Sequence, residues 1–392
     1  MQKEKLWTKD FISITVVNFV LMLSMYLLLV TMATYTTETY NASASTAGLV
    51  ASIFIIGSLI GRLFGGKQIA KIGSKKMLIC GIIIFSIVTV FYFIPTNLYV
   101  LILIRLLHGI GVGLATTATG TIVSQVIPVS RSGEGISYFS LSAVLSTAIG
   151  PLIGLALIAS FGYTSIFIFS LVMGIISLLL ALPVKAPQIE YVASAESTGF
   201  KLSSFFESRA MPVSIAMLVM ALAYSGILSF ITTYAAEIDL VKAGSFYFLV
   251  YALIILISRP FTGKMLDSRG GNSVAYPALV LFAVGMLLLS QAHSSFIFLL
   301  AAAFIGLGYG NFQSTTQALA IKVTPPHRMG LANSTYFIFL DLGLGLGPFL
   351  LGYLVPVVGF RGLYLSLVAL IVIGIFVYYA LHGKRDKEIL QS

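Results

Sequence analysis

The chain has 392 residues, of which 58% are hydrophobic and only 9% are charged. An average soluble domain is about 25% charged, so this composition excludes a water-soluble globule. The net charge of +10 would suit a nucleic-acid-binding protein, but its meaning depends on where the basic residues lie along the chain.

Long apolar segments recur along the whole sequence, each close to the ~20 residues with which a helix crosses a hydrocarbon core about 30 Å thick. We therefore predict an all-α membrane protein. The first segment follows a basic start and is longer than the apolar part of a cleavable signal peptide, so we expect it to remain as a span. In chain order, twelve spans are predicted at residues 11–35, 45–65, 77–95, 98–122, 136–160, 164–184, 210–235, 243–262, 274–292, 296–321, 331–355 and 361–381.

The basic residues are divided unequally between the two sides of the predicted membrane. Of the 23 Lys and Arg residues, twenty lie in the termini and the even-numbered loops, and only Lys242 and Arg361 lie in odd-numbered loops. Positive charge is enriched in cytoplasmic loops, so both termini are expected to be cytoplasmic. The basicity thus indicates topology and not a nucleic-acid partner. A multi-pass protein of the cell membrane, a bacterial inner membrane, is the expected location.

The two halves of the sequence match one another at a shift of 197 residues without a gap, and Arg62 falls on Arg259. Both halves enter from the cytoplasm, so this is a parallel repeat, and such transporters bind substrate near the midplane between the repeats. We predict one six-helix bundle over residues 1–184, a cytoplasmic linker over 185–209 and a second six-helix bundle over 210–392.

The loop after the second span reads GKQIAKIGSKK, from Gly66 to residue 76. It resembles the loop signature of major facilitator superfamily transporters, in which Gly66 and Gly73 match the glycines. Ala70 stands where the family has an aspartate, whereas the second copy of the loop keeps that acid as Asp267. The resemblance implies that this carboxylate lies near a helix N-terminus in the other half, where negative charge is favoured, and latches one conformation.

Two further motifs carry the resemblance. RLLHGIGVG in the fourth span is similar to the signature of proton-linked members, through Arg105, and AIGPLIG in the fifth span is similar to the Gly-Pro signature of drug:proton antiporters. The resemblance implies a fold of two pseudo-symmetric six-helix bundles and proton-coupled export by alternating access. Conformational gating is expected at the loop signatures and the Gly-Pro pairs: Arg62, Gly66, Gly73, Gly150, Pro151, Arg259, Gly263, Asp267, Gly270, Gly347 and Pro348.

Polar residues concentrate in the first, fourth, seventh and tenth spans, which are also the cavity helices that the resemblance implies. Amide, aromatic and methionine side chains together suit an amphipathic organic molecule. The alternative is that these residues only join helices by hydrogen bonds, which is the commoner role for a lone histidine in a membrane. The predicted substrate-binding residues are Asn18, Met22, Tyr26, His108, Thr116, Tyr224, Asn311, Gln313, Gln317, Asn333 and Phe337.

Asp341 is the deepest carboxylate of the sequence, within the apolar run YFIFLDLGLGLGPFLLGYL. An ionised group at the bilayer centre costs about 2.5 to 3.5 kcal/mol, so such residues are kept for a specific use. We predict that Asp341 exchanges a proton or binds the positive end of the substrate, and that Arg105 acts on the acid as an electrostatic switch. The alternatives are capping or helix pairing within a glycine-rich packing surface for Asp341, and neutralisation by neighbouring carbonyls for Arg105.

The chemistry of the sequence separates three classes of function. We find no metal-ligand spacing, no nucleophile-histidine-acid set and no phosphate-binding loop, so an enzyme, a metal site and a cofactor are not expected. A channel would need a charged or carbonyl-rich filter. The prediction is a monomeric secondary transporter in the lipid bilayer that exchanges small amphipathic compounds or drugs for protons. The alternative is a proton-linked importer or a facilitator of a sugar or other small metabolite.

Overall fold

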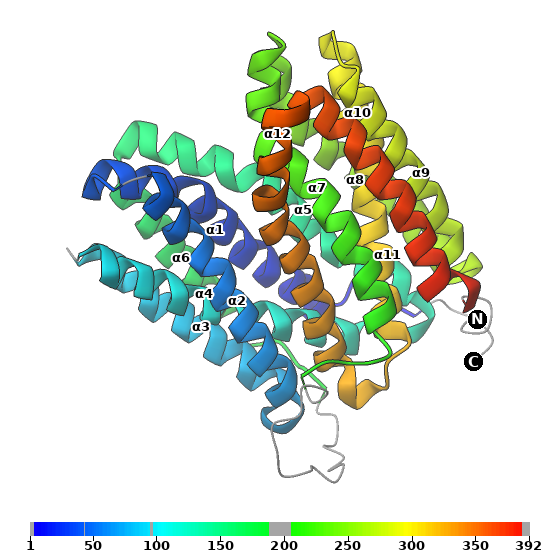
Figure 1. Ribbon diagram of the computed structural model, residues 1–392. Helices are drawn as coiled ribbons and strands as arrows, with labels where there is room; N and C mark the ends of the chain where they lie inside the picture. Colours follow the sequence, from blue (N-terminus) through cyan, green and yellow to red (C-terminus); the bar gives the residue numbers. More distant parts are fainter. Residues whose placement is uncertain (1–3, 43, 95–96, 188–204, 386–392) are drawn as a thin grey trace. The chain divides into compact units, whose positions relative to one another are not determined.

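The computed structural model describes residues 4–42, 44–94, 97–187 and 205–385, and every regular element in these ranges is a helix (Figure 1). The all-helical prediction is confirmed. In the first half of the sequence the helices are α1 (Lys9–Tyr40), α2 (Ala44–Ile72), α3 (Ser74–Val90), η1 (Phe91–Phe93), α4 (Leu98–Val126), η2 (Val129–Arg131), α5 (Ser132–Phe161) and α6 (Tyr163–Ala181).

The second half follows the same order with two differences. Its tenth span is interrupted by a π-helix, and its last two spans run together as one long element. The helices are α7 (Met211–Glu237), α8 (Val241–Arg269), α9 (Gly271–Ser290), α10 (Ser295–Ile305), the π-helix η4 (Gly306–Gly310), α11 (Asn311–Lys322), η5 (Pro326–Arg328), α12 (Met329–Leu381) and η6 (Gly383–Arg385).

Eleven helices in the described ranges are long and apolar enough to cross a membrane. The twelfth predicted span is contained in α12, which has 53 residues. At 1.5 Å per residue a straight helix of that length would measure about 80 Å, more than twice the thickness of a hydrocarbon core. Gly359 interrupts it with φ 68°, so α12 consists of two helices that meet at this glycine.

The glycines with positive φ mark where helices end, and they follow the repeat. Within the described residues they are Gly73 (φ 90°), Gly162 (75°), Gly270 (82°) and Gly359 (68°). The shift of 197 residues places Gly73 on Gly270 and Gly162 on Gly359. Only glycine adopts this conformation without steric cost, so the repeat fixes the same two chain reversals in each half.

Within each half, the second and fourth helices approach one another closely at positions that match under the repeat. A Cβ atom on Gly109 of α4 would lie 2.1 Å from the carbonyl oxygen of Phe54 in α2. A Cβ atom on Gly306 would lie 2.9 Å from the carbonyl oxygen of Tyr251 in α8. Gly306 and Tyr251 are the repeat equivalents of Gly109 and Phe54, so the backbones of the second and fourth helices of each half pack through glycine at the same level.

Residue contacts divide the chain into two compact units. Unit 1 comprises Met1–Pro128, Ser142–Glu207 and Pro325–Thr335; unit 2 comprises Val129–Leu141, Ser208–Thr324 and Tyr336–Ser392. Each unit therefore includes the first turns of one helix from the other half of the sequence: the start of α5 belongs to unit 2, and the start of α12 belongs to unit 1.

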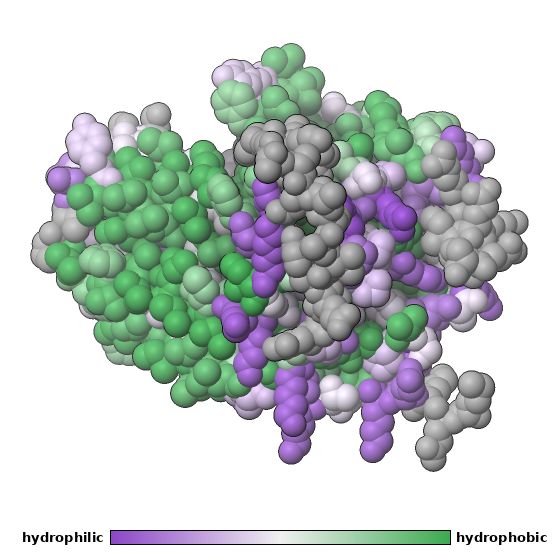
Figure 2. Space-filling view, turned by 90° about the horizontal axis from the view of Figure 1, so that it is seen from below, coloured by the Kyte–Doolittle hydropathy of each residue, from purple (hydrophilic) through white to green (hydrophobic). Residues whose placement is uncertain are grey.

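The surface divides into apolar and polar regions. Figure 2 shows one face of the molecule, on which hydrophilic side chains gather toward the middle and the lower right and hydrophobic side chains cover the left. Large apolar side chains are exposed along the spans, among them Phe261 (73%) and Phe376 (67%). Exposed apolar side chains of this size suit contact with lipid chains, and the hydrophilic side chains suit water.

Candidate transport site and gating contacts

The most unusual buried group of unit 1 is Arg105 of α4, whose exposed fraction is 0%. Its Nε atom donates to the carbonyl oxygen of Val50, 3.1 Å away, and its guanidinium carbon lies 4.6 Å from the centre of the Phe54 ring. Neither Nη atom has a hydrogen-bond acceptor among the described residues. The cation is thus held by one carbonyl and one aromatic face, with the hydroxyl of Tyr92 close to it.

His108 lies one turn further along α4 and is also fully buried. Its Nδ1 atom lies 3.2 Å from the hydroxyl of Tyr92, and its Nε2 atom lies 3.3 Å from the hydroxyl of Thr89. These partners belong to η1 and α3. Both ring nitrogens are therefore occupied by bonds that join α4 to α3, and a substrate-binding role of His108 stays a prediction.

Asn18 of α1 joins three helices. Its Nδ2 atom donates to the Ser142 hydroxyl of α5 at 2.7 Å, and its Oδ1 atom accepts from the Thr119 hydroxyl of α4 at 2.7 Å. Further along the same helix, Met22 is buried and Tyr26 is half-buried. The amide of Asn18 thus acts as a fixed joint within unit 1 in this conformation.

Two repeat-related arginines connect the second and fourth helices of each half. Arg62 donates from Nη1 to the hydroxyl of Thr116 at 3.0 Å. Arg259 donates from Nη1 to the hydroxyl of Ser314 and from Nη2 to the carbonyl oxygen of Gly310 at 3.1 Å. Both arginines are buried, with exposed fractions of 1% and 0%. Thr116, predicted to bind substrate, here receives the side chain of Arg62.

A stack of tyrosines occupies the interior of unit 2. The rings of Tyr224 and Tyr309 are nearly parallel, with centres 3.9 Å apart. The ring of Tyr251 also stacks with that of Tyr224, with centres 5.6 Å apart. Tyr309 comes from the π-helix η4, and such helices occur frequently at functional sites. Next to it, Asn311 donates to the Ser258 hydroxyl at 3.0 Å and so ties the same region to α8.

The predicted polar stripe of the eleventh span crosses the boundary between the contact units. Asn333 belongs to unit 1, where it packs against Gly120: a Cβ atom there would lie 1.8 Å from the Asn333 Nδ2 atom. Asp341 belongs to unit 2 and is 8% exposed. Arg105 and Asp341 are thus in different units. Of the other predicted binding residues here, Gln317 (1%) and Phe337 (6%) are buried and Gln313 is partly exposed.

Asp267, at the end of α8, caps the start of α5 within unit 2. Its two carboxylate oxygens accept from the backbone N–H groups of Gly133, at 2.6 Å, and Glu134, at 2.9 Å. Gly263 allows the close approach, because a Cβ atom on it would lie 2.7 Å from the Glu134 Cα atom. A carboxylate on the first free N–H groups of a helix is favoured by the helix dipole. The latching role of Asp267 stays a prediction.

The repeat-related loop of the first half approaches the start of α12 without a carboxylate. The hydroxyl of Ser334 donates to the carbonyl oxygen of Arg62 at 2.6 Å. A Cβ atom on Gly66 would lie 2.4 Å from the Ser334 Cβ atom, and one on Gly330 would lie 2.1 Å from the Ile69 side chain. These contacts lie within unit 1. Tight backbone packing here accompanies the replacement of the acid by alanine.

The two Gly-Pro pairs lie inside helices. Pro151 is in α5 and Pro348 is in α12. A Cβ atom on Gly150 would lie 3.0 Å from the backbone nitrogen of Leu27 in α1, and one on Gly347 would lie 1.8 Å from the Ser225 hydroxyl in α7. Each pair thus combines a tight helix contact with a missing helical hydrogen bond. A hinge at these points stays a prediction.

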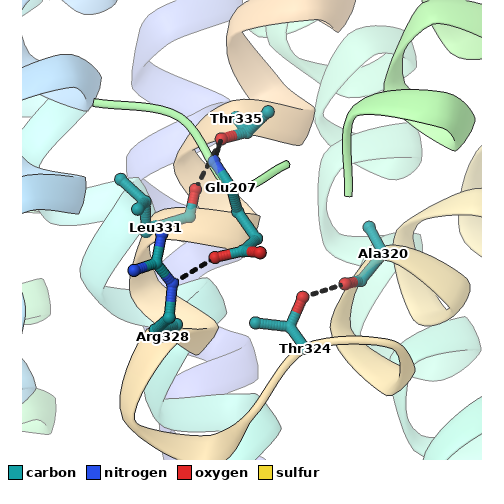
Figure 3. A network of polar contacts seen from close by, with 6 residues as sticks. All are labelled: Glu207, Ala320, Thr324, Arg328, Leu331 and Thr335. Atoms are coloured by element: carbon teal, nitrogen blue, oxygen red, sulfur yellow. Dashed lines mark hydrogen bonds and ion pairs between the residues drawn. The ribbon is translucent and has the colours of Figure 1, made fainter. Parts of the chain in front are cut away.

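An ion pair that was not predicted from the sequence lies at the start of α12, between Glu207 of the linker and Arg328 (Figure 3). The backbone N–H of Glu207 donates to the Thr335 hydroxyl at 2.9 Å. Glu207 is 2% exposed. The signal that would have found it is a single acid in the stretch SSFFESR, just before a span.

Helices of membrane-spanning length, two matched helix sets and buried charge define a membrane transporter. The family profile described as Major Facilitator Superfamily matches residues 14–289 and 245–391. The chain therefore belongs to the Major Facilitator Superfamily, which is a family of transporters.

Comparison with individual proteins supports the same assignment. The chain is 25% identical to an uncharacterized MFS-type transporter of Methanocaldococcus jannaschii over 94% of this chain and 97% of the relative. It is 22% identical to the staphylopine export protein of Staphylococcus aureus, over 85% and 86%. The crystal structure of a bacterial homologue of the iron transporter ferroportin, in its outward-facing state, superposes with a TM-score of 0.77 at 15% identity, over 95% of this chain and 99% of that one.

Proposed function

We propose that the chain is a proton-coupled secondary active transporter that exports small amphipathic organic compounds by alternating access. Its moving bodies are the bundles of residues 1–184 and 210–392, joined by the linker 185–209, in the inner cell membrane with both termini in the cytoplasm. The substrate and protons are its partners, and it works as a monomer.

The observation that carries this proposal is the environment of Arg105. A buried cation without a counter-charge costs several kcal/mol. Its guanidinium meets one carbonyl, one ring and the nearby hydroxyl of Tyr92, and none of these groups carries a negative charge. The presence of the Arg105 guanidinium at that cost is explained if a negatively charged group approaches it in another state of the transport cycle.

Asp341 is our candidate for that changing charge. It is 8% exposed in a glycine-rich part of α12, so both protonation and deprotonation of its carboxylate are sensitive to a change of surroundings. A proton taken up by Asp341 in one state and released in another would couple transport to the proton gradient, worth about 1.4 kcal/mol per proton per pH unit.

The direction and the substrate class rest on two kinds of support. The Gly-Pro motif at Gly150 and Pro151 is similar to that of exporters, and one relative is named as an export protein. The interior of unit 2 offers stacked tyrosine rings, and that of unit 1 offers methionine and amide groups. Such surfaces bind flat or flexible apolar bodies and orient them with few polar bonds.

A two-stage experiment tests the proposal. Thermal shift of the purified protein with rhodamine 6G, ethidium and tetraphenylphosphonium first selects a bound probe. Everted membrane vesicles with an imposed pH gradient then report accumulation of that probe. We expect accumulation with the wild type and with the control Glu237→Gln, and its loss with Arg105→Ala and Asp341→Asn.

Two outcomes would overturn the proposal. Undiminished gradient-driven accumulation in both variants would show that Arg105 and Asp341 do not couple protons. Accumulation only in right-side-out vesicles under an inward proton gradient would establish the importer instead.

A further inference from the structure

The starts of α5 and α12 occupy equivalent positions in the repeat, but only the start of α5 has carboxylates at its two acid positions. At the start of α5, Glu134 forms an ion pair with Arg131, with 2.9 Å between Oε2 and Nη2, and Asp267 accepts two backbone N–H groups. The shift of 197 residues places Leu331 on Glu134, Ala70 on Asp267 and Arg328 on Arg131. The start of α12 therefore keeps the arginine and loses both carboxylates.

The carboxylate of Glu207 lies where the missing acids would act. It forms an ion pair with Arg328, although Glu207 and Arg328 are 121 residues apart in the sequence (Figure 3). The exposed side-chain fraction is 3% for Glu207 and 39% for Arg328. A second bond runs from the Glu207 N–H to the Thr335 hydroxyl, which itself donates to the carbonyl oxygen of Leu331 at 2.8 Å. Glu207 thus contacts Arg328, just before α12, and Thr335, two turns into it.

The same short segment is anchored to α2 on its other side. Phe205 is 6% exposed, its ring meets that of Phe64 at 6.2 Å, and the Nζ atom of Lys67 lies 4.5 Å from the ring centre. Residues 205–207 therefore connect the end of α2 to the start of α12 within unit 1. The loop aspartate of the family would connect the same two helices.

We propose that Glu207 is the gating carboxylate of the second helix start, supplying to Arg328 the ion pair that Glu134 gives to Arg131 and that Leu331 cannot make. Phe205, Glu207, Arg328 and Thr335 form a clasp that holds the start of α12 on α2, and each transport cycle breaks and re-forms it. The cycle itself rests on the proposed function. Residues 205–207 thereby become part of the gate, since Glu207 supplies the charge that the start of α12 and its facing loop both lack.

Distance measurement between spin labels tests the clasp. Labels are placed at two exposed positions, Lys71→Cys in the last turn of α2 and His327→Cys in the middle of η5, in a Cys80→Ser background. The sample is the purified full chain in nanodiscs without substrate or pH gradient. We expect the wild type and the control Glu237→Gln to give one dominant short distance. Glu207→Gln should raise the ratio of long to short distances about tenfold, because a charge-assisted bond is lost.

Rescue separates gating from simple stabilisation. Ala70→Asp introduced into Glu207→Gln should restore the short distance, since a carboxylate at residue 70 would face the N–H groups of Gly330 and Leu331 as Asp267 faces Gly133 and Glu134. Unchanged distances in Glu207→Gln, or lengthened distances that Ala70→Asp does not reverse, would overturn the proposal. Neither reading depends on whether Arg105 and Asp341 couple protons.

Discussion

Helix α4 and its repeat counterpart, the span formed by α10, η4 and α11, pack alike and bury different groups. Arg105 and His108 of α4 fall on Ala302 and Ile305 of the counterpart, both of which are buried and apolar. The counterpart instead buries Tyr309, one turn later, through its π-helix. The repeat thus preserves how the helices pack, whereas the buried charge of Arg105 is found in the first half alone.

The acid of the eleventh span departs from the symmetry in the same way. Asp341 falls on Val144, which is 4% exposed. Arg62 and Arg259, by contrast, keep the repeat and each donates to a hydroxyl of the neighbouring fourth or tenth span. Symmetric charges therefore join helices. Arg105 and Asp341, for which we propose the coupling role, instead lie inside their spans and fall on the apolar residues Ala302 and Val144.

The largest expected effect separates function from stability at Arg105. Arg105→Leu should lower gradient-driven transport of the selected probe at least about tenfold, since it removes the proposed switch. Taking a charge out of water costs several kcal/mol and an apolar side chain avoids this cost, so the melting temperature should hold or rise. Wild-type transport together with a lower melting temperature would assign Arg105 to folding alone.

The packing shared by the two spans should respond equally to added volume. A Cβ atom on Gly111 would lie 2.8 Å from the Phe85 nitrogen, and one on Gly308 would lie 2.4 Å from the Phe282 nitrogen. We expect Gly111→Ala and Gly308→Ala each to cost about 1–3 kcal/mol in the free energy of unfolding, because the backbone must move.

Gly352 of α12 is the matched control for these glycines, since nothing lies within 4 Å of a Cβ atom there. Gly352→Ala should stabilise by up to about 1 kcal/mol through helix propensity. Reversible unfolding in mixed micelles measures all three variants. A neutral Gly111→Ala beside a costly Gly308→Ala would show that the two halves do not pack alike.

The smallest effects concern two tyrosines that contact the same ring, Phe298 of α10. The hydroxyl of Tyr234 donates to the carbonyl oxygen of Leu289 at 2.9 Å, whereas the buried hydroxyl of Tyr247 has no partner among the described residues. Tyr234→Phe should cost about 1 kcal/mol. Tyr247→Phe should be neutral or slightly stabilising in the same unfolding measurement, and a cost equal to that of Tyr234→Phe would contradict the assignment.

Local sequence signals were enough to predict the helices and the repeat. Hydrophobic runs located the spans because bilayer thickness fixes their length, and Gly359 was recognisable as the counterpart of Gly162. The π-helix at η4 was not predicted, since its three glycines read equally well as a straight packing surface.

Side-chain partners across long sequence distances could not be predicted in the same way. The sequence placed Asn18 and His108 on polar stripes but did not reveal that their polar groups meet Ser142, Thr119, Thr89 and Tyr92. Glu207 carries no periodic signal, because it stands between spans, and its role depends on folding against α12. Contacts of this kind arise from tertiary packing and not from local pattern.

Proton release on probe binding is the decisive measurement of the proposed coupling by Arg105 and Asp341. The purified protein, in weakly buffered solution with a pH indicator, receives the selected probe. We expect proton release by the wild type and by Glu237→Gln, and none by Asp341→Asn or Arg105→Leu, although both variants still bind the probe. Proton release of wild-type size from Asp341→Asn would contradict the proposed coupling.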